Sequence, residues 1–130
     1  MLVFASSKDE VTKIYNFLSS NNINSGIISG ALEARERKNM LRRIKNNEFQ
    51  VVVCSDLAAR GLDIENVTDV LNFDLPNNIE YYYHRAGRSG RNYKNGDCYS
   101  FFDNDTTNIP LKLIRDGLKV DYLKFKDGEL

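Results

Sequence analysis

The sequence predicts an α/β domain in which a mostly parallel sheet carries helices on both faces. Short apolar runs, each of the length of a buried strand, alternate with segments that have the 3.6-residue periodicity of a helix. Strands that alternate with helices form a parallel sheet through right-handed crossovers. The chain has 130 residues and contains no repeat, linker or low-complexity tract, so residues 1–130 are expected to form a single domain.

Each expected element has its own signal. Continuous apolar runs predict buried strands, and weak alternation near the end of the chain predicts a short edge strand. The strands are expected at residues 2–5, 25–28, 50–54, 67–73, 97–102 and 118–125. Helices are expected after Ser7, from Glu33 to Lys45, after Asn77 or Asn78, and up to about residue 116.

The first two helices differ in what their sequences indicate. Ser7 and Glu10 fit a capping box, so Ser7 is expected to be an N-cap, and the same helix start can also receive a phosphate. The helix from Glu33 to Lys45 buries a stripe that includes Met40, Leu41 and Ile44, and its charged majority is most simply a solvated face.

Composition excludes several classes of protein. Hydrophobic residues make up 42% of the chain and charged residues 28%, which is ordinary for a soluble globular domain. The sequence has no apolar run of membrane-spanning length and no visible signal peptide, so a cytoplasmic protein is expected. Cys54 and Cys98 lie in apolar runs without metal-ligand spacing, so we expect buried reduced thiols and no metal site.

Charge is segregated along the chain although its total is zero, with 18 basic and 18 acidic residues. A neutral total does not indicate attraction of the whole molecule to nucleic acid. However, residues 33–45 hold six Lys or Arg against two Glu, and residues 56–80 hold six Asp or Glu against one Arg. Such segregation can hide a positive face.

The stretch 81–91 carries the most distinctive chemistry. Arg85, Arg88 and Arg91 recur every three residues, with two glycines and no carboxylate among them. Guanidinium groups in this setting suit a phosphate, which they can bind bidentately. The alternatives are a solvated basic turn, or pairing of these arginines with the acidic stretch at 56–80.

A second group of polar residues follows the third expected strand. Ser55 and Asp56 come directly after it, and ligands of open α/β sheets bind outside the carboxyl ends of the strands. Gly61 is expected to relax the backbone between Arg60 and Asp63. A local salt bridge between that arginine and carboxylate is one interpretation. A carboxylate that accepts a hydrogen bond from a ribose hydroxyl is the other.

Taken in order, these segments resemble the motifs of the second RecA-like domain of DEAD-box RNA helicases. The matching segments are residues 2–7 (motif IV), Gly30 with Arg37 (the Gln-x-x-Arg region), residues 55–64 (motif V), residues 72–76 and residues 84–91 (motif VI). The resemblance covers about residues 1 to 117. It implies a three-layer RecA-like fold of the P-loop NTPase type.

The sequence departs from the family pattern at two positions. The glutamine of the Gln-x-x-Arg region would fall at Ala34, so that contact is missing and Arg37 stands alone. Motif V usually opens with threonine, and here Ser55 keeps the hydroxyl.

The resemblance implies roles for individual residues. Arg88 and Arg91 resemble catalytic arginines that reach the γ-phosphate of ATP, and Gly61 and Asp63 are expected to contact the same nucleotide. The RNA backbone is expected to be held by Ser7, Gly30, Arg37, Ser55 and Arg60. Coupling between the ATP state and the grip on RNA is expected from Asp56, His84 and Arg85.

The phosphate-binding loop and the Asp-Glu-Ala-Asp motif of the family are absent. The chain is therefore expected to be one lobe of a longer two-lobe RNA helicase, with ATP and Mg²⁺ bound mainly by the N-terminal lobe. RNA and that lobe are the expected partners. By itself the fragment is expected to be a monomer without appreciable ATPase activity.

Two other functions fit the same residues. One is the equivalent lobe of a superfamily 2 DNA helicase or translocase, which would be indifferent to RNA 2′-hydroxyls. The other is a non-catalytic RNA-binding scaffold, whose function would survive the change Arg91→Ala.

Overall fold

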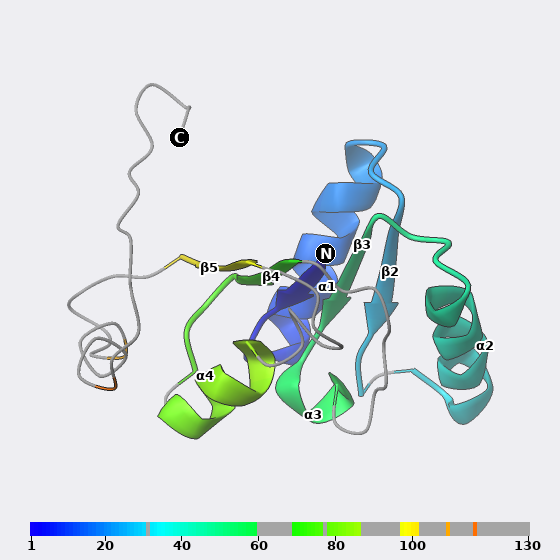
Figure 1. Ribbon diagram of the computed structural model, residues 1–130. Helices are drawn as coiled ribbons and strands as arrows, with labels where there is room; N and C mark the ends of the chain where they lie inside the picture. Colours follow the sequence, from blue (N-terminus) through cyan, green and yellow to red (C-terminus); the bar gives the residue numbers. More distant parts are fainter. Residues whose placement is uncertain are drawn as a thin grey trace.

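The computed structural model describes residues 1–30, 32–59, 69–76, 78–86, 97–101, 109 and 116. These residues form a five-stranded parallel sheet in the order β2-β3-β1-β4-β5, flanked by helices (Figure 1). The strands are β1 (Leu2–Phe4), β2 (Ser25–Ile28), β3 (Val51–Cys54), β4 (Asp69–Asn72) and β5 (Asp97–Ser100). The helices are α1 (Lys8–Ser20), α2 (Ala34–Lys45), α3 (Asp56–Ala59) and α4 (Ile79–Ala86).

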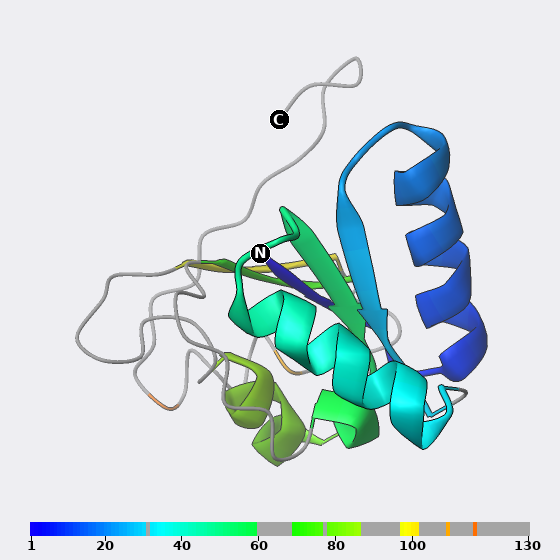
Figure 2. The same cartoon turned by 90° about the vertical axis from the view of Figure 1, so that its right-hand side faces the viewer.

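Helices cover both faces of the sheet, as the sequence predicts (Figure 2). Successive residues of β1 point to opposite faces, because side chains alternate along a strand. Leu2 and Phe4 join a core cluster with Ile44 of α2, whereas Val3 joins a second cluster with Val11 of α1. Burial on both faces explains why the strands are continuous apolar runs rather than alternating ones. The expected three-layer RecA-like architecture is confirmed.

Several boundaries differ from the expected ones. The helix expected from Glu33 begins at Ala34, with Glu33 at the N-cap position. The strand expected at 97–102 ends at Ser100. The expected edge strand at 118–125 and most of the helix expected to end near residue 116 lie outside the described residues.

Side chains cap two helices as the sequence indicates. The Glu10 backbone N–H donates to Oγ of Ser7 at 3.1 Å, which confirms Ser7 as the N-cap of α1. At α4 the Glu80 N–H donates to Oδ1 of Asn78 at 2.7 Å, so of the two expected caps Asn78 has a capping hydrogen bond, and residue 77 lies outside the described residues.

Both cysteines are reduced thiols, in accord with the expectation. Cys54 is buried, but Cys98 is only half-buried, so the prediction of two buried thiols is wrong for Cys98. The Tyr82 hydroxyl lies 3.7 Å from the Cys98 Sγ. Burial is the main cause that raises the pKa of the Cys98 thiol and the pKa of Tyr82, so both groups are neutral at pH 7.

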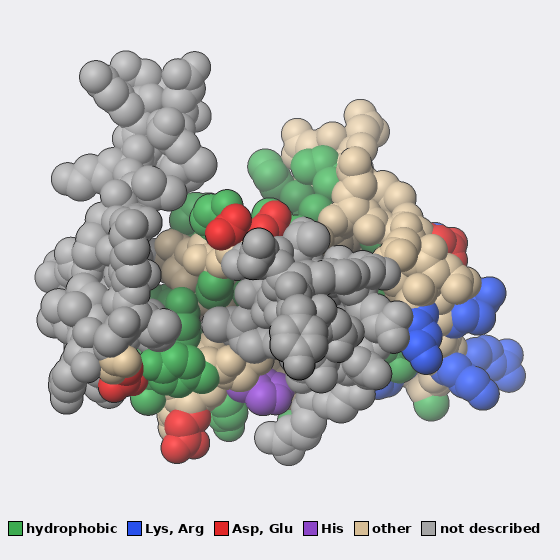
Figure 3. All heavy atoms as spheres, in the orientation of Figure 1, with side chains coloured by type: hydrophobic (Ala, Val, Ile, Leu, Met, Phe, Trp, Pro, Cys, Tyr) green, Lys and Arg blue, Asp and Glu red, His purple; other side chains and the backbone are tan. Residues whose placement is uncertain are grey.

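The predicted charge segregation has a structural counterpart. Figure 3 shows Lys and Arg side chains gathered at the right of the molecule, over α2. Within the described ranges, no helix combines the length and apolar character that crossing a membrane requires.

The Arg85 side chain is fully buried, and its guanidinium donates five hydrogen bonds. Nε donates to Oδ1 of Asp56 at 2.6 Å and Nη2 donates to Oδ2 at 2.7 Å, so this ion pair is bidentate. Nη1 donates to Oδ1 of Asn72 at 3.3 Å and to the Asp74 carbonyl at 2.7 Å, and Nη2 also donates to Oγ of Ser6 at 3.3 Å. A guanidinium has five N–H groups, so every donor is used.

The partners of Arg85 lie at the carboxyl ends of three strands. Ser6 follows β1, Asp56 follows β3, and Asn72 ends β4. The carboxylate of Asp74 accepts hydrogen bonds from the Ser6 backbone N–H at 2.9 Å and from its hydroxyl at 2.7 Å. For Arg85, pairing with the acidic stretch at 56–80 is therefore confirmed. We call Arg85 and these four partners the arginine network.

Gly26 in β2 permits close packing against the end of α2 and the segment after it. A Cβ at Gly26 would lie 2.8 Å from Cδ2 of Phe49 and 3.2 Å from Sδ of Met40. We expect Gly26→Ala to lower the free energy of unfolding by about 1–3 kcal/mol, because the Phe49 ring must shift. Urea denaturation would measure this loss.

A second substitution tests the cause of that loss. In a Phe49→Ala background the obstructing ring is gone, so Gly26→Ala should cost much less. Equal losses in the two backgrounds would show that the contact with Phe49 is not the cause.

The arginine network predicts a large loss of stability for Arg85→Met. The substitution leaves the Asp56 carboxylate and the Asn72 amide without their buried donor, and we expect a loss of about 3–5 kcal/mol in the free energy of unfolding. Urea denaturation of the variant and the original chain measures it.

Arg43→Met is the matched control. Arg43 also pairs with a carboxylate, that of Glu48 at 3.3 Å, but its side chain is 40% exposed. Its guanidinium lies over the Phe49 ring at 4.7 Å, as that of Arg85 lies over the Phe4 ring at 5.4 Å. Exposed ion pairs contribute about 1 kcal/mol or less. Similar losses for the two variants would contradict the importance given to burial of Arg85.

Candidate functional site

A cavity of about 900 Å³ opens at the carboxyl edge of the sheet. This is the edge at which open α/β sheets bind ligands, and the volume is in the usual range for a ligand pocket. Its walls come from the β1–α1 turn with the start of α1, the loop after β2, the residue after β3, and helices α2, α3 and α4. The lining residues are Ser6, Lys8, Gly30, Arg37, Ser55, Asp56, Leu57, Ala58, Glu80, Tyr81 and His84.

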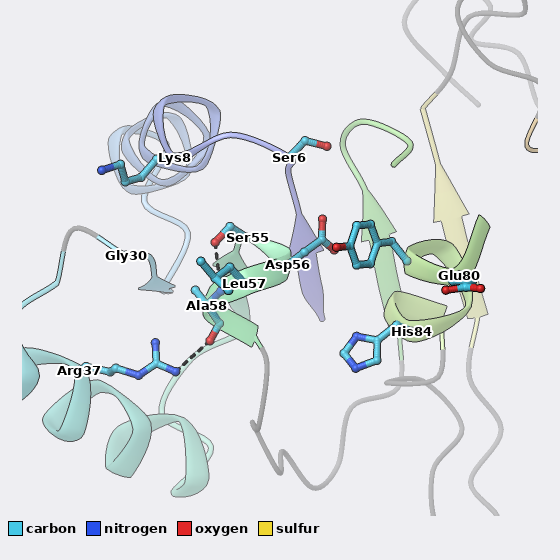
Figure 4. A pocket seen from close by; sticks show the side chains of 11 residues that line it. Ser6, Lys8, Gly30, Arg37, Ser55, Asp56, Leu57, Ala58, Glu80 and His84 are labelled. Carbon is cyan, nitrogen blue, oxygen red and sulfur yellow. Dashed lines mark hydrogen bonds between the residues drawn. The ribbon is translucent and has the colours of Figure 1, made fainter. Parts of the chain in front are cut away.

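One wall of the cavity combines a bare backbone with a fixed cation. Figure 4 shows Gly30 and Arg37 on the same side, with the Arg37 guanidinium reaching toward α3. Nη2 of Arg37 donates to the Ala58 carbonyl at 3.0 Å. Among the described residues Arg37 has no carboxylate partner, so its charge is available to an anion in the cavity. A Cβ at Gly30 would meet nothing within 4 Å, so the chain is bare here without being crowded.

The strand–helix junction after β3 lies between the two walls. Oγ of Ser55 accepts a hydrogen bond from the Ala58 backbone N–H at 3.3 Å and so holds the first turn of α3. The same short helix presents Leu57, whose side chain is 73% exposed although it lines the cavity. The junction therefore offers a hydroxyl and an apolar side chain next to each other.

Helix α4 forms the opposite wall. Glu80 and His84 lie on that side in Figure 4, one turn of helix apart. Tyr81 also lines the cavity and is 49% exposed. Asp56 is held at this side by its bidentate pair with Arg85, which lies behind the cavity wall.

The electrostatic balance of the cavity favours an anion. Lys8 and Arg37 contribute full positive charges, and the carboxylate of Asp56 is already balanced by Arg85. Glu80 is the remaining carboxylate among the described lining residues. Neither in the cavity nor anywhere else in the part of the chain that the structure describes do three His, Cys, Asp or Glu side chains lie together so that they could hold a metal ion.

The cavity gathers most of the predicted site residues that the structure describes. The five that line it are Gly30, Arg37, Ser55, Asp56 and His84. Ser7 does not line it, although both of its chain neighbours do. Arg85 lies behind it in the arginine network. Five other predicted site residues lie outside the described residues: Arg60, Gly61, Asp63, Arg88 and Arg91.

Sequence reasoning missed several lining residues. Lys8 had a usable signal, because it directly follows the predicted cap Ser7 at a helix start. Tyr81 precedes His84 by three residues, so the helical periodicity alone places the two on one face. Leu57 gave no signal, because an apolar residue after a strand is normally part of the core.

Comparison with known proteins identifies the family. Residues 1–93 match the family model described as the helicase conserved C-terminal domain. The chain is 44% identical over 131 residues to the DEAD-box ATP-dependent RNA helicase CshB of Staphylococcus aureus, a match that covers 99% of this chain. It spans 29% of the length of that relative.

Solved structures give the same answer. The structure of Dbp5 from S. cerevisiae bound to RNA and ADP BeF3 superposes with a TM-score of 0.80 at 29% identity, over 88% of this chain and 31% of that one. Domain 2 of the DEAD-box helicase Mss116p bound to an RNA duplex gives a TM-score of 0.73 at 28% identity, over 80% of this chain and 42% of that one. The chain therefore belongs to the family of helicase conserved C-terminal domains, and within it to the DEAD-box type.

Proposed function

We propose that the chain is the C-terminal lobe of a cytoplasmic ATP-dependent RNA helicase. In this proposal it provides half of an RNA-backbone site and supplies arginines to an ATP–Mg²⁺ complex that the N-terminal lobe mainly binds. Transfer of the γ-phosphoryl group of ATP to water, which releases ADP and phosphate, resets the enzyme. Closure of the two lobes on RNA would part a duplex locally.

The observation that carries the proposal is the convergence of Gly30, Arg37 and Ser55 on one cavity. These residues follow β2, lie in α2 and follow β3, and the resemblance to DEAD-box helicases implies that all three contact the RNA backbone. A guanidinium without a carboxylate partner among the described residues, a hydroxyl and a glycine backbone suit a phosphodiester strand. Contacts of this kind position a nucleic acid without reading its sequence.

The relatives support RNA as the ligand. The matched Dbp5 structure is bound to RNA and the matched Mss116p domain to an RNA duplex. CshB is named as an ATP-dependent RNA helicase. By this likeness we propose RNA as the substrate of the whole protein that contains the chain.

The arginine network supports a coupling role for Asp56, His84 and Arg85. Arg85 joins α4, which presents His84 to the cavity, to Asp56 at the end of β3. A displacement of α4 on contact with the other lobe would therefore act on the RNA side through a buried bidentate pair. Arg88 and Arg91 follow α4 in the sequence, and we propose that they offset charge on the transferred phosphoryl group.

Arg91→Ala in the whole protein tests the catalytic part of the proposal. Arginines that stabilise a phosphoryl transition state contribute about 10³–10⁵ in rate, so RNA-stimulated ATP hydrolysis should fall by about 10³ or more. RNA affinity should change little. Steady-state phosphate release and RNA binding in the presence of a non-hydrolysable ATP analogue measure the two effects.

Lys13→Ala, which removes an exposed charge on α1, is the control and should leave both measurements unchanged. Hydrolysis that persists in Arg91→Ala with unaltered RNA binding would favour the scaffold function. Equal unwinding of RNA and DNA duplexes would favour the DNA helicase instead.

Gly30→Ala tests the RNA part separately. The new methyl group meets no atom within 4 Å, so the free energy of unfolding should change by less than about 0.5 kcal/mol. The methyl group would occupy the space that a backbone phosphate approaches, so RNA affinity should fall by about tenfold. Fluorescence anisotropy with a labelled oligouridine measures it.

Gly26→Ala is the opposite control, because it is expected to lower stability without touching the cavity. If Gly30→Ala binds RNA as tightly as the original protein, the strand does not pass along this wall.

A further inference from the structure

Helix α2 carries an unexplained row of four cations. Arg35, Lys38, Arg42 and Lys45 follow one another at intervals of three or four residues, the spacing that aligns side chains on one face of a helix. All four side chains are exposed. The row spans the eleven residues 35–45, and the ten steps between them give a length of about 15 Å at 1.5 Å per residue. We call these four residues the basic stripe.

The basic stripe lacks carboxylate partners in the part of the chain that the structure describes. Among the described residues, none of its members forms an ion pair, and the side-chain hydrogen bond of Arg42 is to the neutral Asn39 at 2.7 Å. Glu36 lies on another flank of the helix, seven residues before Arg43. Arg43 itself pairs with Glu48. Paired and unpaired cations thus occupy different sides of α2.

Interaction with the helix dipole does not account for the stripe. Cations stabilise the last turn of a helix, which fits Arg42 and Lys45. Arg35 lies in the first turn, where a positive charge faces the positive end of the dipole and is unfavourable. A row that runs the whole length of the helix, including its unfavourable end, has a different cause.

The position of the stripe indicates its ligand. The same helix turns Arg37 into the cavity, and Arg35 lies in the first turn of α2, at the same end of the helix but on its solvent face. From there the row runs along α2 away from the cavity. We propose that the basic stripe binds the phosphates of the RNA strand, or of its duplex continuation, after it leaves the cavity. This inference rests on the proposed function, because it extends the same RNA path.

The chemistry suits phosphates rather than bases. In double-stranded DNA each strand carries a phosphate about every 3.4 Å of the helix axis, and at a comparable spacing in RNA a stripe of this length faces several phosphates of one strand. The flexible side chains at these four positions are exposed, and a backbone read by charge alone gives affinity without sequence preference. The stripe therefore lengthens the bound RNA segment beyond the cavity and makes its binding more sensitive to salt.

The test compares two variants of the intact protein with equal loss of charge. Lys38→Gln with Arg42→Gln removes the middle of the stripe. Lys13→Gln with Arg43→Gln removes two exposed cations outside it, both of which have carboxylate partners. Each variant is titrated over a range of salt with two labelled oligouridines, one short enough to fill only the cavity and one that extends past it by the length of the stripe.

For the stripe variant we expect about tenfold weaker binding of the longer RNA. The slope of log affinity against log salt should become shallower by about 1.4, since each phosphate contact with a single strand contributes about 0.7. Binding of the short RNA should stay within about twofold, and the control variant should behave as the original protein with both RNAs.

Two outcomes would overturn the inference. They are an unchanged salt slope for the longer RNA, or equal losses for the stripe and control variants. In each case the short RNA still reports on the cavity. If the short RNA binds and Gly30→Ala weakens that binding, the proposed function stands whatever the outcome for the stripe. If the original protein binds neither RNA, the proposed function itself is contradicted.

Discussion

Burial of one arginine constrains the edge of the sheet at which the cavity forms. Arg85 has no exposed surface, so its charge is tolerated only because a bidentate carboxylate and three further acceptors surround it. Those acceptors lie at the ends of β1, β3 and β4, three strands that are far apart in sequence. A lysine could not replace it, because an ammonium group has three donors and no fork geometry. The carboxyl edge is thus fixed by one side chain of α4.

This constraint has a consequence for the cavity. Because Asp56 is oriented by Arg85, its charge is balanced and its position is set before any ligand enters. The paired carboxylate of Asp56 therefore repels an anion in the cavity only weakly, and the positive charges of Lys8 and Arg37 attract it. A chain with no net charge can therefore present a site for phosphates. Local pairing of carboxylates, rather than the total charge, decides the sign of the surface.

The sequence allowed accurate prediction of the parts that local physics controls. The strands were predictable because burial on both faces requires apolar runs, and Ser7 because a cap needs only its own helix start. The role of Arg85 could not be separated from that of its neighbours by spacing. Its partner Asp56 is 29 residues away in sequence, and only the crossover topology brings them together. Leu57 escaped prediction for a related reason, since an apolar side chain after a strand is taken as part of the core until its surroundings are known. Tyr81 was missed although its spacing from His84 places both residues on one face of the helix.

Arg85 and the basic stripe show how cationic side chains acquire opposite functions. Arg85 is surrounded by acceptors, so its charge is consumed in holding the fold together. Within the described residues the basic stripe has one neutral acceptor, Asn39, and no carboxylate, so its charge remains for a partner. An unpaired cation costs little free energy when it is fully hydrated. Burying the same cation without hydrogen-bond acceptors would cost far more. Exposure therefore keeps the cations of the basic stripe available for a polyanion. Because the cavity lies at one end of α2, a polyanion that leaves the cavity would run along the helix.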